Sequence, residues 1–373
     1  MLLLSLMMKE EHTYVQIVEK WKPSLYILFL LILLTTACSS NSTPEAEPSE
    51  PVVETPGPAE ELTEEPEAEP EPELAYAAPL TGIRSAEPVD ERPLAVMINN
   101  APAARPQSGL SQADQIYEVL AEGGITRLIA IFQSGGAAET LGPIRSIRPY
   151  LIELGESYGG ILAHAGGSPA AYSILQNEGK PYLDEISNGG PYYFRSSDRK
   201  APHNLYSSVD QLREGAENRG YSLENNAPVY SYLEQGAEVS GEAVRSFDIY
   251  YLNDSYTVSY EYDSTMQQYL RSVNGAEDLD ANDGTHLAAS NIVVLSTSHR
   301  VLDDVGRLAL DLSSGGEAML FQQGQLIRAE WKKSSGDIIR FYKDEKELPL
   351  VPGKSFFSIV PDSPALEEHI TFH

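Results

Sequence analysis

The order of apolar and polar residues along the chain predicts a first half in which strands and helices alternate. Residues 93–100 form a continuous apolar run of strand type that ends in two asparagines. Residues 149–160 predict a helix with Pro149 in its first turn and glycines at its end. Residues 160–175 predict a strand, a glycine turn and a second helix, and residues 207–220 predict a third helix. This alternation is typical of a mixed α/β domain.

The second half has few helix signals and many short runs of β type. Tyrosine and phenylalanine alternate with polar residues in several of these runs, as expected for strands with one solvent-exposed face. The pattern changes at residues 221–236, where polar and turn-forming residues interrupt the apolar periodicity. We therefore predict an α/β N-terminal domain over 90–228 and a mainly β C-terminal domain over 240–373.

Residues 115–132 predict a β-hairpin, because two alternating apolar runs are joined by a Gly-Gly pair. With a two-residue turn at the glycines, Leu120 pairs with Arg127. Alternation along each strand then puts Glu118, Glu122 and Arg127 on one face. This charged group either binds or activates a ligand, or it is a solvent-exposed face with an ordinary ion pair.

Residues 1–38 have the layout of an export signal. Two lysines precede an apolar run of about a dozen residues, short for a membrane-spanning helix, and small residues then lead to Cys38, the one cysteine of the chain. This order is similar to a bacterial lipobox, in which the cysteine thiol receives diacylglycerol, although Thr35 stands where lipoboxes usually have leucine. An uncleaved anchor or a free thiol is the alternative. A single cysteine excludes an intramolecular disulfide.

Residues 39–80 predict a disordered acidic tether. Between Ser39 and Leu74 the chain has twelve glutamates, many prolines and no lysine or arginine. Such a segment cannot bury enough apolar surface to fold, and repulsion between like charges extends it. We expect it to hold the folded part away from the membrane.

The formal net charge of −29 is unevenly distributed. Residues 75–373 contain 40 acidic and 23 basic residues, whereas residues 92–206 contain 10 acidic and 9 basic residues. The acidity and the lack of a basic face argue against a nucleic-acid partner. The seven histidines form no HExxH motif, and one cysteine excludes a thiolate cage, so we expect neither a metal site nor a cofactor.

Residues 142–150, GPIRSIRPY, place Arg145 and Arg148 in a turn framed by two prolines. Two guanidinium groups in a stiff turn of an acidic protein have two explanations. Either they hold an anion, or they neutralise acidic residues inside the protein. Both alternatives remain open from the sequence.

A second candidate site contains His164, Gly166, Gly167 and Ser168. A strand that delivers the histidine and a Gly-Gly-Ser turn that opens a helix together provide free backbone N–H groups for an anion. Ser168 is either a helix N-cap, part of a ligand-holding helix end, or a nucleophile. Pro169 argues against the nucleophile, because it removes the backbone N–H that an oxyanion hole needs.

A third candidate site contains Arg195, Arg199, His203 and Asn204. It is the densest basic run of the exported part, and aromatic residues are interleaved with it. The planar fork of arginine suits phosphate or carboxylate. The alternative is a surface loop whose charges are simply solvated.

Several of these segments, in this order, closely resemble the YerB family of bacterial lipoproteins: residues 92–132, GPIRSIRPY, HAGGSPAAY and RKAPHNLY. Later segments, among them VPGKSFFSIV, resemble the C-terminal module of that family, so the resemblance covers about 90–373. It implies a layered β-β-α sandwich followed by a mainly β half, on a lipid-anchored protein of Gram-positive-type bacteria. The family pattern includes the three candidate sites but implies no reaction.

Two functions follow from these observations. The first is a non-catalytic lipoprotein, exported and lipid-anchored through Cys38 on the outer face of the cytoplasmic membrane. It binds an anionic envelope ligand, either phosphate, a lipid-linked precursor or a wall polymer, in an arginine-lined crevice. The second is a phosphotransferase or hydrolase in which three arginines stabilise a phosphoryl group and Glu118 or Glu122 is the base, with His164 as a further catalytic candidate. We favour the first. The arginines concerned are Arg127, Arg145 and Arg148.

Overall fold

The computed structural model describes residues 74–136, 138–252 and 255–373. The predicted export signal, Cys38 and the tether up to residue 73 lie outside the described residues.

The described part begins before the predicted end of the tether at residue 80. Ala78 and Leu80 are buried, and strands β1 (Tyr76–Ala77) and β2 (Arg84–Ser85) pair with each other. The predicted tether boundary is therefore wrong by several residues, because the last apolar residues of that segment belong to the core.

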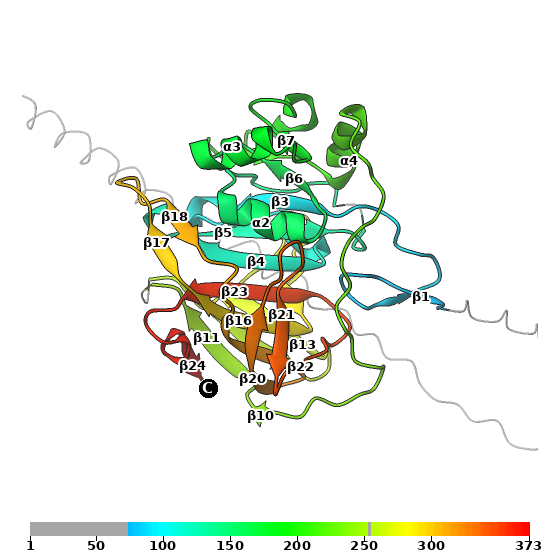
Figure 1. Ribbon diagram of the computed structural model, residues 1–373, viewed down its shortest axis with the longest axis vertical. Helices are drawn as coiled ribbons and strands as arrows, with labels where there is room; N and C mark the ends of the chain where they lie inside the picture. The colour runs from blue at the N-terminus through cyan, green and yellow to red at the C-terminus, as the bar shows by residue number, and fades with distance from the viewer. Residues whose placement is uncertain (1–73, 137, 253–254) are drawn as a thin grey trace, which may run out of the picture. The chain divides into compact units, whose positions relative to one another are not determined.

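Among the described residues, a mixed sheet of twelve strands forms the centre of the molecule (Figure 1). Its strands, in order across the sheet, are β22 (Lys346–Glu347), β21 (Arg340–Lys343), β20 (Gln325–Lys332), β19 (Gly316–Gln322), β16 (Asn291–Thr297), β23 (Ser355–Pro361), β4 (Gln115–Leu120), β5 (Thr126–Phe132), β3 (Leu94–Asn99), β6 (Ile161–His164) and β7 (Tyr182–Asp184), while β10 (Glu242–Ala243) pairs with β20. Strands β3, β4, β6, β7, β16 and β23 run in the same direction.

A second, antiparallel sheet packs against one face of the central sheet. Its strands are β14 (Ala276–Glu277), β13 (Gln268–Val273), β12 (Thr257–Asp263), β11 (Ser246–Tyr250) and β24 (Ile370–Phe372), with β15 (Ala288–Ala289) paired to β13. Two further strand pairs are β8 (Phe194–Arg195) with β9 (Leu205–Tyr206), and β17 (His299–Val301) with β18 (Leu308–Leu310). The short 3₁₀ helices are η2 (Pro102–Ala104), η3 (Leu110–Gln112), η4 (Glu122–Gly124), η5 (Gly190–Tyr192) and η6 (Leu366–His369).

Three α-helices of the described residues complete the layers. Helices α2 (Pro149–Ser157) and α3 (Pro169–Asn177) share one core with the central sheet, and α4 (Val209–Asn218) belongs to the core on its other face. Pro149 occupies the first turn of α2, as the sequence predicts, Pro169 occupies the first turn of α3, and Ser208 caps α4. The predicted mixed α/β fold with a mainly β second half is confirmed.

Successive side chains of a strand point to opposite faces of the central sheet, so one strand contributes to the hydrophobic cores on both faces. In β3, Leu94, Val96 and Ile98 pack in the core shared with the second sheet and α4, whereas Ala95 and Met97 pack in the core shared with α2 and α3. Both faces of the strand are therefore apolar, which explains its continuous apolar sequence.

The two predicted domains share the central sheet. Strand β23, near the C-terminus, pairs in parallel with β4 of the first half over Ser355–Ile359 and Gln115–Val119. The segment 221–236 runs between the halves without a named helix or strand. Residues 74–373 contain every described strand pairing and both cores, so this part of the chain is a folding unit of its own.

Helix α2 approaches the sheet closely at Gly155. A Cβ atom at this position would collide with the Leu162 side chain and would lie 2.9 Å from the Cβ of Ala95. Alanine is a better helix former than glycine by about 1 kcal/mol, but overpacking of a core costs about 1–3 kcal/mol. We expect Gly155→Ala to lower the free energy of unfolding by about 1–2 kcal/mol, measured by urea denaturation. Gln176→Ala, at an exposed position of α3, is the control, and stabilisation by Gly155→Ala would contradict the observed packing.

Candidate functional site

The carboxyl ends of the parallel strands meet at one edge of the central sheet. Asn99 ends β3, Leu120 ends β4, His164 ends β6 and Asp184 ends β7. Ligands of open α/β sheets bind in the loops that follow such strand ends. The glycine turn lies in the loop after β6. The arginine turn, which precedes α2, reaches the same edge by bonding to β3, where the backbone N–H of Arg145 donates to the carbonyl of Met97 at 2.7 Å.

The arginine turn and the glycine turn lie side by side at this edge. The backbone N–H of Ala165 donates to the carbonyl of Arg145 at 3.0 Å, and that of Ile147 donates to the carbonyl of Gly166 at 3.0 Å. Ile147 and Gly167 form a parallel bridge. Two segments that are separate in the sequence therefore form one surface.

Three arginines converge there, and we call Arg127, Arg145 and Arg148 the arginine cluster. Arg127 is buried, donates to the carbonyl of Ser146 at 2.9 Å and lies 3.7 Å from the carboxylate of Glu122. Arg148 forms an ion pair with the same carboxylate. The partly exposed Arg145 side chain has no hydrogen bond or ion pair with any residue that the structure describes.

The arginine cluster carries more positive charge than its surroundings neutralise. Burial lowers the pKa of Arg127 to about 10, and the charge of Arg145 acts in the same direction. Burial also lowers the pKa of Arg145 and Arg148. All three remain protonated at neutral pH, and the carboxylate of Glu122 is the one acidic partner among their described ion pairs. An anion bound there would relieve the mutual repulsion of the guanidinium groups.

The predicted register of the β4–β5 hairpin is wrong by one residue. Arg127 pairs with Val119, not with Leu120, because η4 lengthens the turn and the backbone N–H of Ala121 bonds to the carbonyl of Ile125. A shift of one residue moves a side chain to the opposite face of the sheet. Glu118 therefore does not share a face with Arg127, although Glu122, which lies in the turn, does reach the arginine cluster.

Glu118 lies instead in a buried polar cluster between the two halves. Its carboxylate accepts hydrogen bonds from Thr126 at 2.6 Å, Asn100 at 3.0 Å and Tyr256 at 2.5 Å. It also forms an ion pair with Arg271 of β13 at 2.6 Å. Both carboxylate oxygens of Glu118 accept hydrogen bonds or form an ion pair. The structure therefore does not support its predicted role as a base.

Arg271 was not identified from the sequence. Its guanidinium group joins Glu118 to Asp278, and these two carboxylates raise its pKa well above the ordinary value, against the effect of burial. A signal was available, because alternation in β13 puts Arg271 on the same buried face as Tyr269 and Val273. An arginine at such a position needs a buried acidic partner.

His164 is completely buried beside Asp184. Its Nδ1 lies 2.9 Å from the carbonyl oxygen of Gly166, and its Nε2 has no partner among the described residues. Burial lowers the pKa of His164 to about 4, so the ring is neutral at physiological pH and Nδ1–H donates to Gly166. Its hydrogen bond to the carbonyl of Gly166 positions the glycine turn. The side chain has no exposed surface for catalysis.

Asp184 was also missed by the sequence analysis. It accepts hydrogen bonds from the backbone N–H of Gly166, from Tyr172 and from Ser187, each at 2.8 Å. Burial acts to raise its pKa, but these donors and His164 outweigh burial and lower it. The carboxylate therefore fixes the turn that contacts the arginine segment.

Ser168 is the N-cap of α3. Its hydroxyl accepts a hydrogen bond from the backbone N–H of Ala171 at 3.2 Å, which agrees with the N-cap alternative. Gly166 has a φ of 72°, a left-handed conformation that favours glycine. A Cβ atom at Gly167 would lie 3.1 Å from Ile147, so the close contact of the two loops also favours glycine.

The side chains of the third candidate site contact other residues than those of the arginine cluster. Arg195 pairs with Glu185 at 3.0 Å, and Arg199 donates to the carbonyl of Pro106 at 2.6 Å. His203 lies 2.9 Å from the amide of Asn99, and the side chain of Asn204 donates to the carbonyl of Ser196 at 3.0 Å. Arg199 and His203 hold the β8–β9 hairpin to β3 and the loop after it, Arg195 contacts the segment after β7, and Asn204 acts within the hairpin. These contacts favour a structural role.

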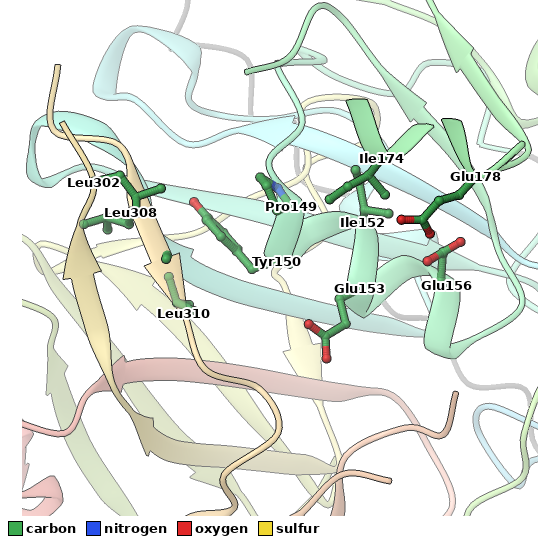
Figure 2. A pocket seen from close by; sticks show the side chains of 11 residues that line it. Pro149, Tyr150, Ile152, Glu153, Glu156, Ile174, Glu178, Leu302, Leu308 and Leu310 are labelled. Carbon is green, nitrogen blue, oxygen red and sulfur yellow. The ribbon is translucent and has the colours of Figure 1, made fainter. Parts of the chain in front are cut away.

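A pocket of about 280 Å³ lies next to the arginine cluster, and none of the predicted site residues lines it (Figure 2). It is formed by α2, α3 and the β17–β18 hairpin. Leucines of the hairpin lie on one side of it and three glutamates of the helices on the other. The lining side chains are those of Pro149, Tyr150, Ile152, Glu153, Glu156, Ile174, Glu178, Leu302, Leu308, Ala309 and Leu310.

No three His, Cys, Asp or Glu side chains within residues 74–136, 138–252 and 255–373 are grouped so that they could hold a metal ion. No helix of these same segments is long and apolar enough to span a membrane.

Comparison with known proteins gives consistent results. Residues 80–222 match the N-terminal domain, and residues 247–357 the C-terminal domain, of a protein family of unknown function, DUF3048. The chain is 40% identical over 298 residues to the "Putative lipoprotein YerB" of Bacillus subtilis (strain 168), covering 79% of this chain and 89% of that protein. The crystal structure of the YerB protein from Bacillus subtilis is similar, with a TM-score of 0.73 and 38% identity, covering 80% of this chain and 99% of that one.

Proposed function

Because this chain belongs to the DUF3048 family of YerB-like proteins, we propose that it is a lipid-anchored lipoprotein whose arginine cluster binds an anionic ligand of the cell envelope. The anchor is Cys38, and the folded part lies on the outer face of the cytoplasmic membrane. The bound group is a phosphate, carried by a lipid-linked precursor, a wall polymer or a small molecule. No reaction is part of this proposal.

The unneutralised charge of the arginine cluster supports the proposal. Two of its guanidinium groups share the single carboxylate of Glu122, and the third, Arg145, is partly exposed without a partner among the described residues. Residues 75–373 carry 17 more acidic than basic residues, so a local excess of positive charge is unusual on this protein. Arginine groups of this kind bind phosphate through two parallel N–H donors.

Binding is favoured over catalysis because the candidate bases are engaged. Glu118 lies on the opposite face of the sheet from Arg127, and Glu122 is paired with Arg148. His164 is buried and neutral. Within the part of the chain that the structure describes, none of the three candidate bases is therefore free beside the arginines for the phosphotransferase or hydrolase alternative.

Removal of Arg145 is expected to weaken anion binding by about 10- to 100-fold, since a charge-assisted hydrogen bond contributes about 1.5–3 kcal/mol. The measurement is isothermal titration calorimetry of residues 74–373 with inorganic phosphate and pyrophosphate at low ionic strength. Arg145→Lys, which keeps the charge but not the planar fork, is expected to lose less than Arg145→Ala.

The matched control is Arg84→Ala, which removes one exposed arginine from β2 and changes the net charge by the same amount. Equal weakening by Arg84→Ala would show a general charge effect and would contradict the site. An absence of phosphate and pyrophosphate binding by the unmodified protein would contradict the proposed function itself.

A further inference from the structure

We infer that the anionic ligand is an amphiphile, with its phosphate at Arg145 and Arg148 and its apolar chain in the pocket between α2, α3 and the β17–β18 hairpin. This inference rests on the proposed function, and it names the class of ligand: a phosphate ester or diphosphate ester of a long apolar alcohol.

The headgroup site and the pocket are adjacent. Arg148 directly precedes Pro149, which lines the pocket. The next residue, Tyr150, also lines the pocket, and its hydroxyl donates to the carbonyl of Leu120 at 3.0 Å. Burial raises the pKa of Tyr150, and the charges of Arg127 and Arg148 oppose that shift, so this residue is close to both arginines.

The β17–β18 hairpin contributes to both parts of the proposed site. Leu302, Leu308 and Leu310 form the apolar side of the pocket in Figure 2. Arg307, between them in the sequence, is close enough to Arg148 for their charges to interact, and it pairs with Asp303 at 3.0 Å. A chain that leaves the arginine cluster along α2 would therefore be covered by apolar side chains on one side.

Exposed apolar side chains also border the arginine cluster. Leu252 lies against Gly124 of the β4–β5 turn, Ile186 lies against Gly166 of the glycine turn, and Gly306 at the tip of the β17–β18 hairpin lies against Gly123. Single exposed apolar residues are ordinary, but these gather at one edge of the sheet. A ligand with an apolar chain can bury its own apolar surface against such a border, whereas free phosphate has no apolar surface to bury. The exposed fractions are 36% for Ile125, 70% for Ile186, 60% for Leu252 and 65% for Val305.

The acidic side of the pocket limits the ligand to one charged end. Glu156 and Glu178 share Lys180 at 2.8 and 3.0 Å, and Glu153 pairs with Lys333 at 2.8 Å. These carboxylates lie across the pocket from the leucines (Figure 2). Three carboxylates against two lysines leave one net negative charge, which disfavours a second anionic group on the ligand.

The test is the dependence of affinity on chain length. Inorganic phosphate, butyl phosphate and octyl phosphate, all below micelle-forming concentrations, are titrated into residues 74–373. We expect octyl phosphate to bind at least about tenfold more tightly than inorganic phosphate, since each buried methylene adds to affinity. Farnesyl phosphate and dodecyl phosphate then distinguish an isoprenoid carrier from a straight-chain lipid. Tighter binding of either one supports the inference.

Leu302→Asn is expected to remove the gain from the octyl chain, so that octyl phosphate binds this variant no more tightly than inorganic phosphate does. The matched control is Ile83→Asn, because the two side chains are similarly exposed, at 46% for Leu302 and 50% for Ile83. Ile83 does not line the pocket. Both variants exchange an apolar side chain for an uncharged polar one, so a difference between them in the gain from the octyl chain reports the pocket.

Three outcomes overturn the inference in distinguishable ways. Phosphate binding that depends on Arg145 without any gain from the octyl chain contradicts the amphiphile and leaves the proposed function intact. Equal binding of octyl phosphate and neutral octyl glucoside contradicts the phosphate headgroup. Failure of every phosphate to bind contradicts both the inference and the proposed function.

Discussion

Replacing Arg271 with alanine is expected to lower the free energy of unfolding by about 3–5 kcal/mol. The guanidinium group lies in the core between the two sheets and is paired with Glu118 at 2.6 Å and with Asp278. Its removal leaves two buried carboxylates without their cation, and the cost of a buried unpaired charge greatly exceeds the cost of a lost surface contact. Urea denaturation followed by circular dichroism measures the change.

The control for this prediction is Arg328→Ala. Arg328 also pairs with a carboxylate, that of Glu367, but both side chains are more than half exposed, so about 0–1 kcal/mol is expected. The double variant Arg271→Met with Glu118→Gln should lose less than the sum of the single losses, because the variants remove both charges of one pair. A similar loss from Arg271→Ala and Arg328→Ala would contradict the buried cluster.

Acid is expected to destabilise the fold through His164. The pKa of this histidine is lowered from 6.5 to about 4 by burial, so the unfolded chain takes up the proton first as the pH falls. Its contribution to the free energy of unfolding is therefore fully present above pH 6.5 and decreases between pH 6.5 and about 4, by about 3 kcal/mol in total. Asp184, whose pKa is lowered, contributes a further loss at still lower pH.

The comparison is between urea denaturation series of the unmodified protein and of His164→Asn over this pH range. Asparagine keeps a donor for the carbonyl of Gly166 but does not titrate, so the variant should show a shallower dependence on pH. Gln176→Ala, at an exposed position of α3 without a titratable side chain, should keep the dependence of the unmodified protein. Parallel curves for all three proteins would show that His164 does not titrate as its burial requires.

Local signals predicted most of the fold. Prolines in the first turns of α2 and α3, serine caps and glycine stops act within a few residues, so their effects can be recognised without knowledge of the rest of the chain. The hairpin register could not be obtained in this way. The Gly-Gly pair predicts a turn, but the presence of Glu122 in η4 adds a residue to it and reverses the face of Glu118.

The candidate site was only partly predictable for a related reason. The arginine turn and the glycine turn were recognised separately, and their contact through Ile147 and Gly167 depends on β3 and β6 being parallel neighbours. The Glu118–Arg271 pair joins residues 153 positions apart. The pocket depends on a hairpin of the second half packing against α2. Contacts between distant segments of this kind have no local sequence signal.

The parallel pairing of β23 with β4 determines when this fold can be completed as the chain is produced. A chain that emerges from its N-terminus delivers β4 early, yet the strand that pairs with it comes from the last twenty residues or so of the chain, at Ser355–Pro361. Until then one side of β4 has unpaired backbone groups, which attract the strands of other chains. A product that stops short of Ser355 would therefore be a substrate for quality-control proteases rather than a smaller working protein.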